Sequence, residues 1–312
     1  TLIKFEKKLK ILTFIGGSGF IGKSFLDAFK RGVLDEFKIS KINVISRKPY
    51  KLKKNKELLS KKIKLIRGNI KSIKKIPKSD IIIYGAENVD PKYYKNINLA
   101  MKNHIKSINN FIKIIRKNNN KAKILYVSSG AVNSIKKNNF NLKIYKDLYA
   151  YLKIYSEKKI QELSKDKISN SIARCYSFIG RWLPRTKHYA IGNFINDALK
   201  KKFIKVKAKN IVIRSYMYAD DLVYWLTKIA INSEIKKSTI YDVGSDESIE
   251  SRKLARLIGN ILKKPVKLRK LISKKVEKYV PNIKKAKNKL NLKVNYNLIS
   301  SIYLTVNSLN NE

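Results

Sequence analysis

Three glycines at intervals of three residues, directly after a short apolar run, constrain the fold of this chain more than any other feature. The run covers residues 10–15, Lys-Ile-Leu-Thr-Phe-Ile, and the segment Gly-Gly-Ser-Gly-Phe-Ile-Gly follows it. A helical spacing of apolar residues then continues to residue 29. In a strand–loop–helix unit, glycines in this register permit a tight turn, let the backbone approach a pyrophosphate, and let helix and strand pack closely.

The pattern predicts a dinucleotide phosphate site at the start of the helix, where unpaired N–H groups favour an anion. The contacts we expect are those of Gly16, Gly19, Phe20, Ile21 and Gly22. The alternative is an ordinary turn with incidental glycines. It is disfavoured because the chain has only 12 glycines and three of them fall in register here.

The end of the second expected strand bears on which dinucleotide binds. The apolar run at 42–45 continues into Ser46, Arg47 and a lysine, without a carboxylate. An acidic residue there would accept the ribose 2′-hydroxyl of NAD, whereas an arginine accommodates the 2′-phosphate of NADP. The sequence therefore favours NADP over NAD, with Ser46 and Arg47 on the phosphate. The alternative, in which Arg47 stacks on adenine above an NAD ribose, stays open.

Further strand-like runs alternate with helical patterns along the chain. Strands are expected near 42–46, 62–66, 80–84, 123–128 and 171–176, and helices near 98–117, 146–165 and 190–201. This alternation predicts an α/β fold, a doubly wound parallel sheet with helices on both faces. Residues 214–229 read as a strand end that runs into a helix, and the last 70 residues as mixed helix and loop.

A serine, a tyrosine and a lysine form the strongest catalytic candidate. The strand at 123–128 ends beside Ser129, and Tyr149 and Lys153 follow on an expected helix, where residues four apart share a face. A nearby ammonium favours the phenolate, so a tyrosine with an ordinary pKa of about 10 can serve as acid or base near neutrality. A serine hydroxyl opposite can hold the reacting carbonyl or hydroxyl.

Composition weakens the tyrosine–lysine spacing on its own. With 18 Tyr and 60 Lys in 312 positions, random placement gives about three Tyr-x-x-x-Lys pairs, and Tyr155 with Lys159 is one. The serine upstream, the small Ala150 and the acid at Glu157 select Tyr149. Tyr155, or a purely structural helix, remains the alternative.

The formal net charge of +49 suggests an anionic partner, but its distribution does not resemble that of a nucleic-acid-binding protein. Basic residues are spread almost evenly, with modest enrichment at 48–78 and 252–289, and only 11 of the 71 are Arg. Arg is preferred for bidentate contacts to phosphates and bases. We therefore attribute most of the excess to compositional drift, because Lys, Ile, Asn and Tyr all have A/T-rich codons. A nucleic-acid partner is not expected.

Composition also excludes several classes of protein. A hydrophobic content of 44% is too high for a disordered basic tail. The single cysteine, Cys175, excludes a disulfide framework and a Cys-based zinc site, and with two histidines, His104 and His188, no metal centre is expected. No apolar run reaches the roughly 20 residues of a transmembrane helix, and no leader pattern is present. We expect a cytoplasmic protein that does not associate with membranes.

Taken together, these motifs resemble the extended short-chain dehydrogenase/reductase family, and within it the NAD(P)-dependent sugar-nucleotide epimerase/dehydratase group. The resemblance covers nearly the whole chain. Besides the glycine loop and the Ser–Tyr–Lys set, it rests on Ile81–Ala86, Arg174–Gly180, Ala190–Ile195, Arg214–Leu222 and Tyr241–Ser245. It implies a Rossmann-like fold with a smaller, discontinuous substrate-binding region. We expect 1–175 and 209–244 to form the dinucleotide-binding domain, and 176–208 and 245–312 the substrate-binding region.

The resemblance also implies roles for single residues. Ser129 would hold the sugar C4 oxygen, Tyr149 would be the acid/base, and Lys153 would bind the nicotinamide ribose and tune Tyr149. Further cofactor contacts are implied for Ala86 and for Asn69, which replaces an Asp that usually lies near the adenine. The implied nucleotide-sugar contacts are Ser177, Asn193, Phe194 and Arg214. Arg214 would contact the diphosphate, and the alternative role for this arginine is a surface salt bridge. Cys175 and His188 would line the pocket or the core.

Two departures from the family pattern narrow the chemistry. Gly130 and Ala131 stand where 4,6-dehydratases have an Asp-Glu pair, so dehydration by that route is not expected. Ser177 stands where many epimerases have an Asn on the diphosphate. The resemblance thus implies hydride transfer at C4 of a nucleotide-activated sugar, as a 4-epimerase or a 4-keto-6-deoxysugar reductase for surface polysaccharide synthesis, in a homodimer. The alternative is a catalytically inactive reductase-like protein that binds nucleic acid or another anionic partner.

Overall fold

The computed structural model describes residues 8–88, 90–134, 141, 144–185 and 189–310. The chain divides into two compact units, each made from two segments. Unit 1 is Thr1–Cys175 with Val223–Tyr241, and unit 2 is Tyr176–Leu222 with Asp242–Glu312. The chain returns to unit 1 at Val223, later than the return at residue 209 that the sequence predicts.

Unit 1 is built on a seven-stranded sheet in the order β11-β6-β5-β4-β1-β2-β3. The strands are β1 (Lys10–Ile15), β2 (Ile39–Ser46), β3 (Ile63–Arg67), β4 (Ile81–Tyr84), β5 (Lys123–Ser129), β6 (Asn170–Cys175) and β11 (Thr239–Val243). From β3 to β6 the neighbouring strands pair in parallel. The chain order reverses between β1 and β4, and in such sheets ligands bind at the carboxyl ends of the strands beside that switch point.

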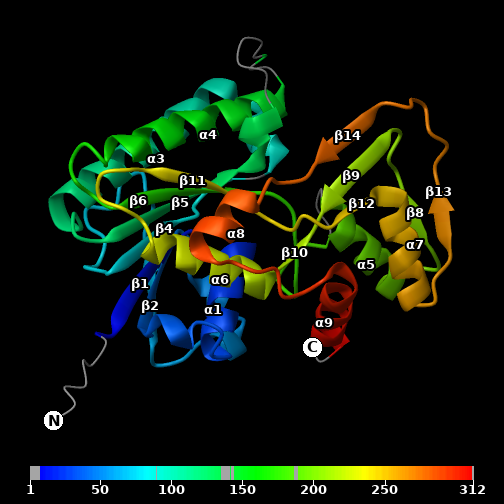
Figure 1. The fold of residues 1–312 in the computed structure, drawn as a ribbon, viewed down its shortest axis with the longest axis horizontal. Helices are drawn as coiled ribbons and strands as arrows, with labels where there is room; N and C mark the ends of the chain where they lie inside the picture. Colours follow the sequence, from blue (N-terminus) through cyan, green and yellow to red (C-terminus); the bar gives the residue numbers. More distant parts are fainter. Residues whose placement is uncertain (1–7, 89, 135–140, 142–143, 186–188, 311–312) are drawn as a thin grey trace. The chain divides into compact units, whose positions relative to one another are not determined.

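Helices cover both faces of this sheet (Figure 1). Helices α3 (Ile97–Asn118) and α4 (Tyr145–Glu162) lie on one face, and α1 (Phe20–Lys30) and α6 (Ala219–Ile231) on the other. Short helical segments join them, namely η1 (Asp35–Phe37), α2 (Tyr50–Lys53), η2 (Lys56–Leu58), η3 (Pro91–Lys95) and η4 (Gly130–Ser134). The expected doubly wound α/β sheet is confirmed.

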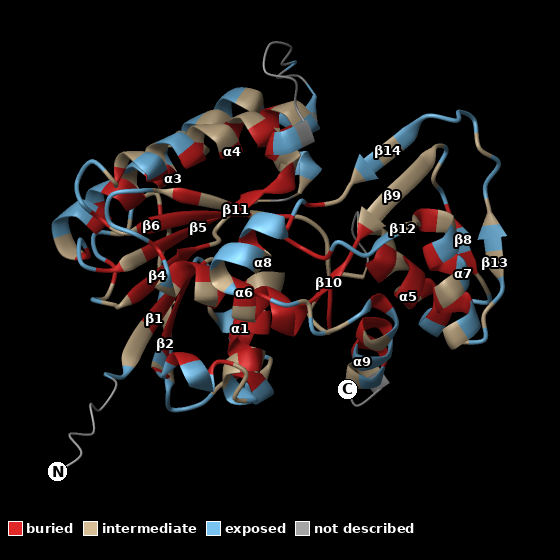
Figure 2. Cartoon of the chain, in the orientation of Figure 1, coloured by how far each residue is buried: buried red, intermediate tan, exposed pale blue. Residues whose placement is uncertain are grey.

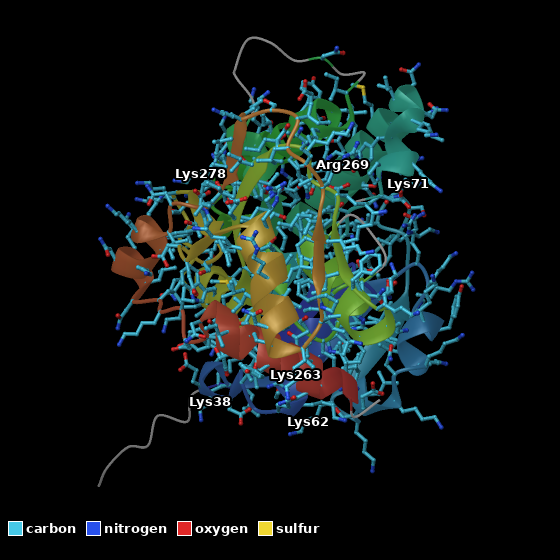
Figure 3. The ribbon with its side chains drawn as sticks, turned by 90° about the vertical axis from the view of Figure 1, so that its right-hand side faces the viewer. Lys38, Lys62, Lys71, Lys263, Arg269 and Lys278 are labelled. Carbon is cyan, nitrogen blue, oxygen red and sulfur yellow. The ribbon has the colours of Figure 1, made fainter. Side chains whose placement is uncertain are left out.

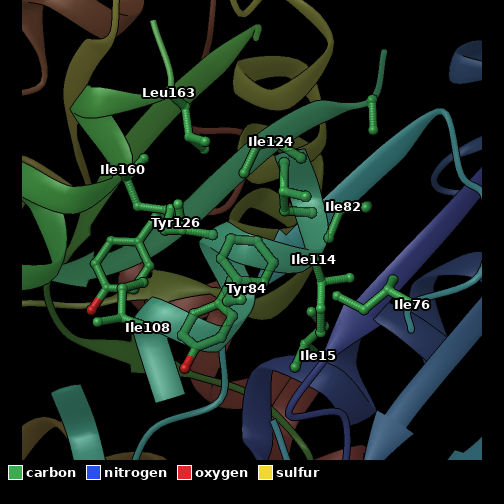
Figure 4. Close-up of a cluster of buried hydrophobic side chains, with 14 of the residues drawn as sticks. Ile15, Ile76, Ile82, Tyr84, Ile108, Ile114, Ile124, Tyr126, Ile160 and Leu163 are labelled. Carbon is green, nitrogen blue, oxygen red and sulfur yellow. The ribbon is translucent and has the colours of Figure 1, made fainter. Parts of the chain in front are cut away.

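The central strands are buried on both faces, which is why they appear in the sequence as short continuous apolar runs, whereas the edge strand β3 has no buried residue (Figure 2). Between the sheet and the α3/α4 layer lies a cluster of isoleucines with two buried tyrosines (Figure 4). Tyr84 and Tyr126 stand on neighbouring strands with ring centroids 5.7 Å apart. On the opposite face Phe14 packs on Phe25 of α1 at 5.0 Å.

Unit 2 holds three smaller sheets and four helices among its described residues. The strands pair as β10 (Met217–Tyr218) with β7 (Phe178–Ile179), β13 (Val266–Leu268) with β8 (Ile204–Val206), and β12 (Ser248–Glu250) and β14 (Val276–Tyr279) on either side of β9 (Ile211–Ser215). The helices are α5 (Ala190–Lys200), α7 (Ser251–Ile261), α8 (Lys284–Leu290) and α9 (Leu298–Asn310). The last 70 residues therefore contain strands that the apolar pattern did not predict.

Basic side chains project from many separate elements (Figure 3). The labelled ones are Lys38, Lys62 and Lys71 in unit 1 and Lys263, Arg269 and Lys278 in unit 2. Both units carry part of the excess positive charge. Among the helices of the described ranges, none combines the length and the apolar character that a membrane crossing requires.

Candidate active site

The loop between β1 and α1 is shaped by glycines that leave no room for a side chain. Gly16 has a φ of +97°, and a Cβ there would lie 2.6 Å from the Cα of Ala86. A Cβ on Gly22 would lie 2.3 Å from the Cα of Gly17. These positions thus bring β1, α1 and the end of β4 together by direct backbone contact.

Gly19 differs because a Cβ there would make only an ordinary van der Waals contact, with the Gly16 carbonyl oxygen nearest at 3.8 Å. Gly19 is also the N-cap of α1, and in the described structure this helix start has no side-chain cap and no acidic residue in its first turn. Such an end favours an anion. The loop therefore fits the diphosphate of a dinucleotide, with the backbone at Gly19, Phe20, Ile21 and Gly22 as the cradle.

The other expected cofactor residues lie on the same edge of unit 1. Ser46, the last residue of β2, accepts a hydrogen bond from the N–H of Lys48 at 3.3 Å and donates to Ser18 of the glycine loop at 3.0 Å. Arg47 follows it and is exposed. Asn69 comes two residues after β3, where its side chain accepts from the N–H of Lys71 at 3.2 Å. Ala86 contacts Gly16 after β4.

Ser129, Tyr149 and Lys153 are brought together at the end of β5. Ser129 is the last residue of β5, and its Oγ accepts the N–H of Ala131 at 3.2 Å. Tyr149 and Lys153 are one turn apart on α4, with the Lys153 Nζ 5.7 Å from the centroid of the Tyr149 ring. Ser129 also makes a side-chain hydrogen bond with Tyr149. Tyr155, the other candidate, packs against the apolar cluster instead.

Lys153 is held firmly, with 3% of its side chain exposed. Its ammonium donates to the carbonyl of Val127 at 3.0 Å and lies 3.2 Å from Oε2 of Glu87. Burial alone would lower the pKa of Lys153, but Tyr126, Glu87 and Tyr149 together hold this pKa well above its ordinary value. Lys153 is therefore a fixed positive charge at any physiological pH.

The same groups act on Tyr149 with opposite signs. Burial raises the pKa of Tyr149, Lys153 lowers it and Glu87 raises it, while the hydrogen bond from Ser129 lowers it, and the net shift is upward. Tyr149 is thus protonated at rest in the protein alone. Chemically, this is a phenol poised to donate a proton to an oxygen held beside it.

A second buried network supports the serine strand. Glu157, 5% exposed, accepts two hydrogen bonds from Arg174 at 2.9 and 2.7 Å and one from Ser128 at 2.5 Å. Arg174 also donates to Asn133 at 2.6 Å. The network ties α4 to β5 and β6 beside Ser129. Cys175, the next residue after Arg174, is buried and acts electrostatically on Tyr149.

Two residues of this region were not predicted from the sequence. Glu87 lies after β4, and its carboxylate pairs with both Lys153 and His104, the latter at 3.3 Å. No motif contains either residue, and the available signal was only an acid at the carboxyl end of a central strand.

The four expected substrate residues all lie in unit 2. Ser177 is half-buried, and its carbonyl accepts the N–H of Met217 at 3.1 Å. Asn193 and Phe194 lie in the first turns of α5, half-buried and buried respectively. Arg214 is on β9 with its guanidinium 5.1 Å from the centroid of the Tyr279 ring. Their roles stay predictions, and His188 lies outside the described residues.

No cluster of three or more His, Cys, Asp or Glu side chains in the part of the chain that the structure describes is placed to hold a metal ion.

A family model identifies the family to which the chain belongs. The model of the "NAD dependent epimerase/dehydratase family" matches residues 13–244. The chain belongs to this family. The match covers the glycine loop, Ser129, Tyr149 and Lys153, so the resemblance inferred from the motifs is confirmed. Among curated proteins, a sequence search finds no match.

Solved structures show the same fold at low sequence identity. A UDP-N-acetylglucosamine 4-epimerase from Methanobrevibacter ruminantium, in complex with UDP-N-acetylmuramic acid, has a TM-score of 0.80 at 17% identity and covers 97% of this chain and 99% of its own. A UDP-glucose 4-epimerase from Thermotoga maritima with UDP-glucose has a TM-score of 0.75 at 16% identity, covering 96% and 99%. A double mutant of the dTDP-glucose 4,6-dehydratase DesIV from Streptomyces venezuelae, with NAD bound, has a TM-score of 0.75 at 15% identity, covering 96% of each chain.

Proposed function

We propose that this chain catalyses NAD(P)-dependent hydride transfer at C4 of a nucleotide-activated sugar. The observation that carries the proposal is the junction of Ser129, Tyr149 and Lys153 at the end of β5, in the same unit as the glycine cradle. A protein that only binds a partner has no need of a buried phenol beside a fixed ammonium. The intact trio thus speaks against the inactive, anion-binding alternative.

Each residue has a distinct task in this reaction. When bound, a nicotinamide would accept or supply the hydride of C4. Ser129 holds the C4 oxygen by its hydroxyl, and Tyr149 exchanges the proton of that oxygen. In the oxidative direction Tyr149, as phenolate, takes the O–H proton while the C4 carbonyl forms, and the hydride of C4 would pass to a bound nicotinamide. In the reductive direction Tyr149 returns this proton to the C4 oxygen while C4 would regain a hydride, and the Lys153 ammonium stabilises the phenolate form of Tyr149.

Two outcomes are compatible with these tasks. A 4-epimerase keeps its cofactor and reduces the keto-sugar again from the other face. A reductase takes a 4-keto-6-deoxy sugar and an exchangeable reduced cofactor. Epimerases of UDP-sugars are among the similar structures, which supports the first, while Arg47 favours NADP and so the second. Gly130 and Ala131 supply no acid or base, so they do not support the dehydration that the name of DesIV describes.

The finer expectations are part of this proposal. NADP is preferred, a nucleotide diphosphate sugar is contacted by Ser177, Asn193, Phe194 and Arg214, and the protein works as a cytoplasmic homodimer in surface polysaccharide synthesis. Support for NADP is the exposed Arg47 at the end of β2, although DesIV is a structure with NAD bound. An exposed arginine is free to form a bidentate contact with a phosphate.

The decisive experiment incubates the protein with NADPH, NADH, NADP⁺ and NAD⁺ and a panel of nucleotide 4-keto and 4-hydroxy sugars. Nicotinamide absorbance and product stereochemistry report hydride transfer. We expect turnover of at least one sugar, reduced at least about 100-fold in Tyr149→Phe because general acid–base catalysis is lost. Tyr155→Phe, six residues further along α4, is the matched control and is expected to retain activity. Absence of any turnover, or equal activity of Tyr149→Phe, would overturn the proposal.

A further inference from the structure

A buried ion pair stands behind Lys153 and is not explained by the family motifs. Glu87 lies in the connection after β4, with 14% of its side chain exposed, and its Oε2 is 3.2 Å from the Lys153 Nζ. Its other oxygen, Oε1, accepts from the backbone N–H of Asn88 and lies 3.3 Å from Nδ1 of His104. The carboxylate therefore faces two nitrogen groups from two different helices.

His104 extends this arrangement to α4. Its Nε2 lies 2.7 Å from the Oγ of Ser156, and only 8% of its side chain is exposed. Because a carboxylate only accepts, Nδ1 of His104 carries the proton directed at Glu87. The contacts thus run from Lys153 to Glu87, from Glu87 to His104 on α3, and from His104 back to Ser156 on α4. Glu87 is fixed from two sides.

We propose that Glu87 is a positioning residue, whose carboxylate fixes the Lys153 ammonium at the end of β5 and offsets the charge of that ammonium at Tyr149. The inference rests on the proposed function, because it concerns the acid/base of the same site. Lys153 is held by Val127 on one side and by Glu87 on another, which limits the positions that its flexible stem can reach. Loss of Glu87 would leave Lys153 with a buried charge and fewer partners.

The effect of Glu87 on the charge at Tyr149 depends on the titratable groups that face the Glu87–Lys153 pair. These groups come from the elements packed around the pair: Tyr84 on β4, His104 on α3, Tyr126 on β5, Tyr149 on α4 and Cys175 at the end of β6. Burial opposes the charged form of Glu87, but Lys153 and His104 hold its pKa at about 2, so it stays negative. At Tyr149 this negative charge raises the pKa while Lys153 lowers it. The pair therefore acts on Tyr149 less strongly than Lys153 would alone.

The consequence is a smaller effect of Lys153 on Tyr149. Burial is the largest cause of the raised pKa of Tyr149, and the Glu87 charge raises it further, against the lowering by Lys153. Tyr149 is therefore protonated in the protein without cofactor or sugar, and this is the form that donates to a 4-keto sugar.

The test is an alkaline titration of the protein without cofactor or sugar. Tyrosinate absorbance is followed in the parent and in Tyr149→Phe, and their difference isolates Tyr149 from the other tyrosines. In Glu87→Gln, compared with Glu87→Gln/Tyr149→Phe, we expect the midpoint of Tyr149 to fall by about one pH unit, the size of a partly screened charge at this range. An unchanged or higher midpoint would overturn the proposal.

Two matched variants separate charge from packing. Glu87→Asp keeps the charge and is expected to leave the midpoint near that of the parent. Glu162→Gln, on α4 but in an exposed pair with Lys159, is also expected to leave it unchanged. A fall in either variant as large as that in Glu87→Gln would show that the charge of Glu87 is not the cause.

A second comparison remains if Glu87→Gln does not fold. The double variant Glu87→Gln/Lys153→Met removes both charges and leaves no buried ion unpaired. Because the two charges offset each other, its Tyr149 midpoint is expected within about half a unit of the parent. A rise of a full unit or more would mean that Lys153 acts alone and would refute the inference. The titration uses no substrate, so a lack of sugar turnover would sink the proposed function without deciding this result.

Discussion

The glycine loop gives the sharpest test of the cofactor site, because its glycines are required for different reasons. We compare alanine at Gly19 with alanine at Gly22. At Gly22 the new Cβ would lie 2.3 Å from the Cα and 2.4 Å from the carbonyl oxygen of Gly17, so backbone must move. Overpacking of this kind costs about 1–3 kcal/mol or more, which exceeds the gain of about 1 kcal/mol in helix propensity.

At Gly19 the balance is different. Its φ of −87° suits alanine, and the nearest atom to a Cβ is 3.8 Å away. Replacing an N-cap glycine by alanine costs some tenths of a kcal/mol, and the less flexible unfolded chain returns about as much. The free energy of unfolding is therefore expected to change by less than about 0.5 kcal/mol. The methyl group would instead occupy the open side of the helix start, where the diphosphate is expected.

The assay pairs thermal unfolding with calorimetric titration of NADPH and NADH. We expect Gly22→Ala to lower the unfolding temperature clearly, and Gly19→Ala to keep it while the dissociation constant rises at least tenfold, about 1.4 kcal/mol. Parental cofactor affinity in Gly19→Ala would refute the placement of the diphosphate. A large loss of stability in that variant would refute the inference that a Cβ fits at Gly19 without a clash.

Three further predictions concern single charges. Arg47→Ala is expected to weaken NADPH binding at least tenfold and to spare NADH, whereas an equal loss for both, measured by titration, would favour stacking on adenine. Glu157→Gln breaks the buried pair with Arg174 and is expected to lower the free energy of unfolding by about 2 kcal/mol, measured by chemical unfolding. The loss is smaller than that for a fully buried pair because Arg174 keeps some solvent contact. A loss as small as that of the exposed Glu162→Gln would contradict this prediction. Because Glu87 titrates at about pH 2 when folded and higher when unfolded, its pair stabilises the protein above the unfolded value and loses this effect as the pH falls to 2. The stability difference between parent and Glu87→Gln should shrink by about 3 kcal/mol from pH 5 to pH 2, and a constant difference would contradict the assignment.

Six of the seven strands of unit 1 were predictable because each is a local apolar run that is visible without its partners, whereas β11 (Thr239–Val243), in which polar and apolar residues alternate, was not predicted. The strand near 123–128 and the helix near 98–117 are observed within one residue of those limits, as Lys123–Ser129 and Ile97–Asn118. The same rule fails in unit 2. The strands Val266–Leu268 and Val276–Tyr279 are three and four residues long, with exposed lysines between the apolar positions. They exist because β8 and β9, distant in the sequence, pair with them.

The site divides in a similar way. Ser129, Tyr149 and Lys153 could be predicted because the end of a strand and the spacing of residues along a helix are visible in the local sequence. The pairing of Glu87 is not visible there, since its partners His104 and Lys153 are 17 and 66 residues away. They meet Glu87 only when α3 and α4 pack on the same face of the sheet. Interactions that join separate elements across a sheet are the part of an active site that spacing within one sequence does not reveal.

The scarcity of acidic residues makes the buried ones more informative than the many lysines. Among the described residues Lys153 is the only buried lysine, while Glu157, Asp197 and Asp221 are buried and each meets specific donors. Burial of a charge without partners costs free energy, so a buried carboxylate needs hydrogen-bond donors or cations beside it. An exposed lysine has no such requirement and can accumulate by drift. In a chain with a net charge of +49, the specific electrostatics are therefore expected at its few carboxylates, and Glu87 is the one that touches the proposed catalytic lysine.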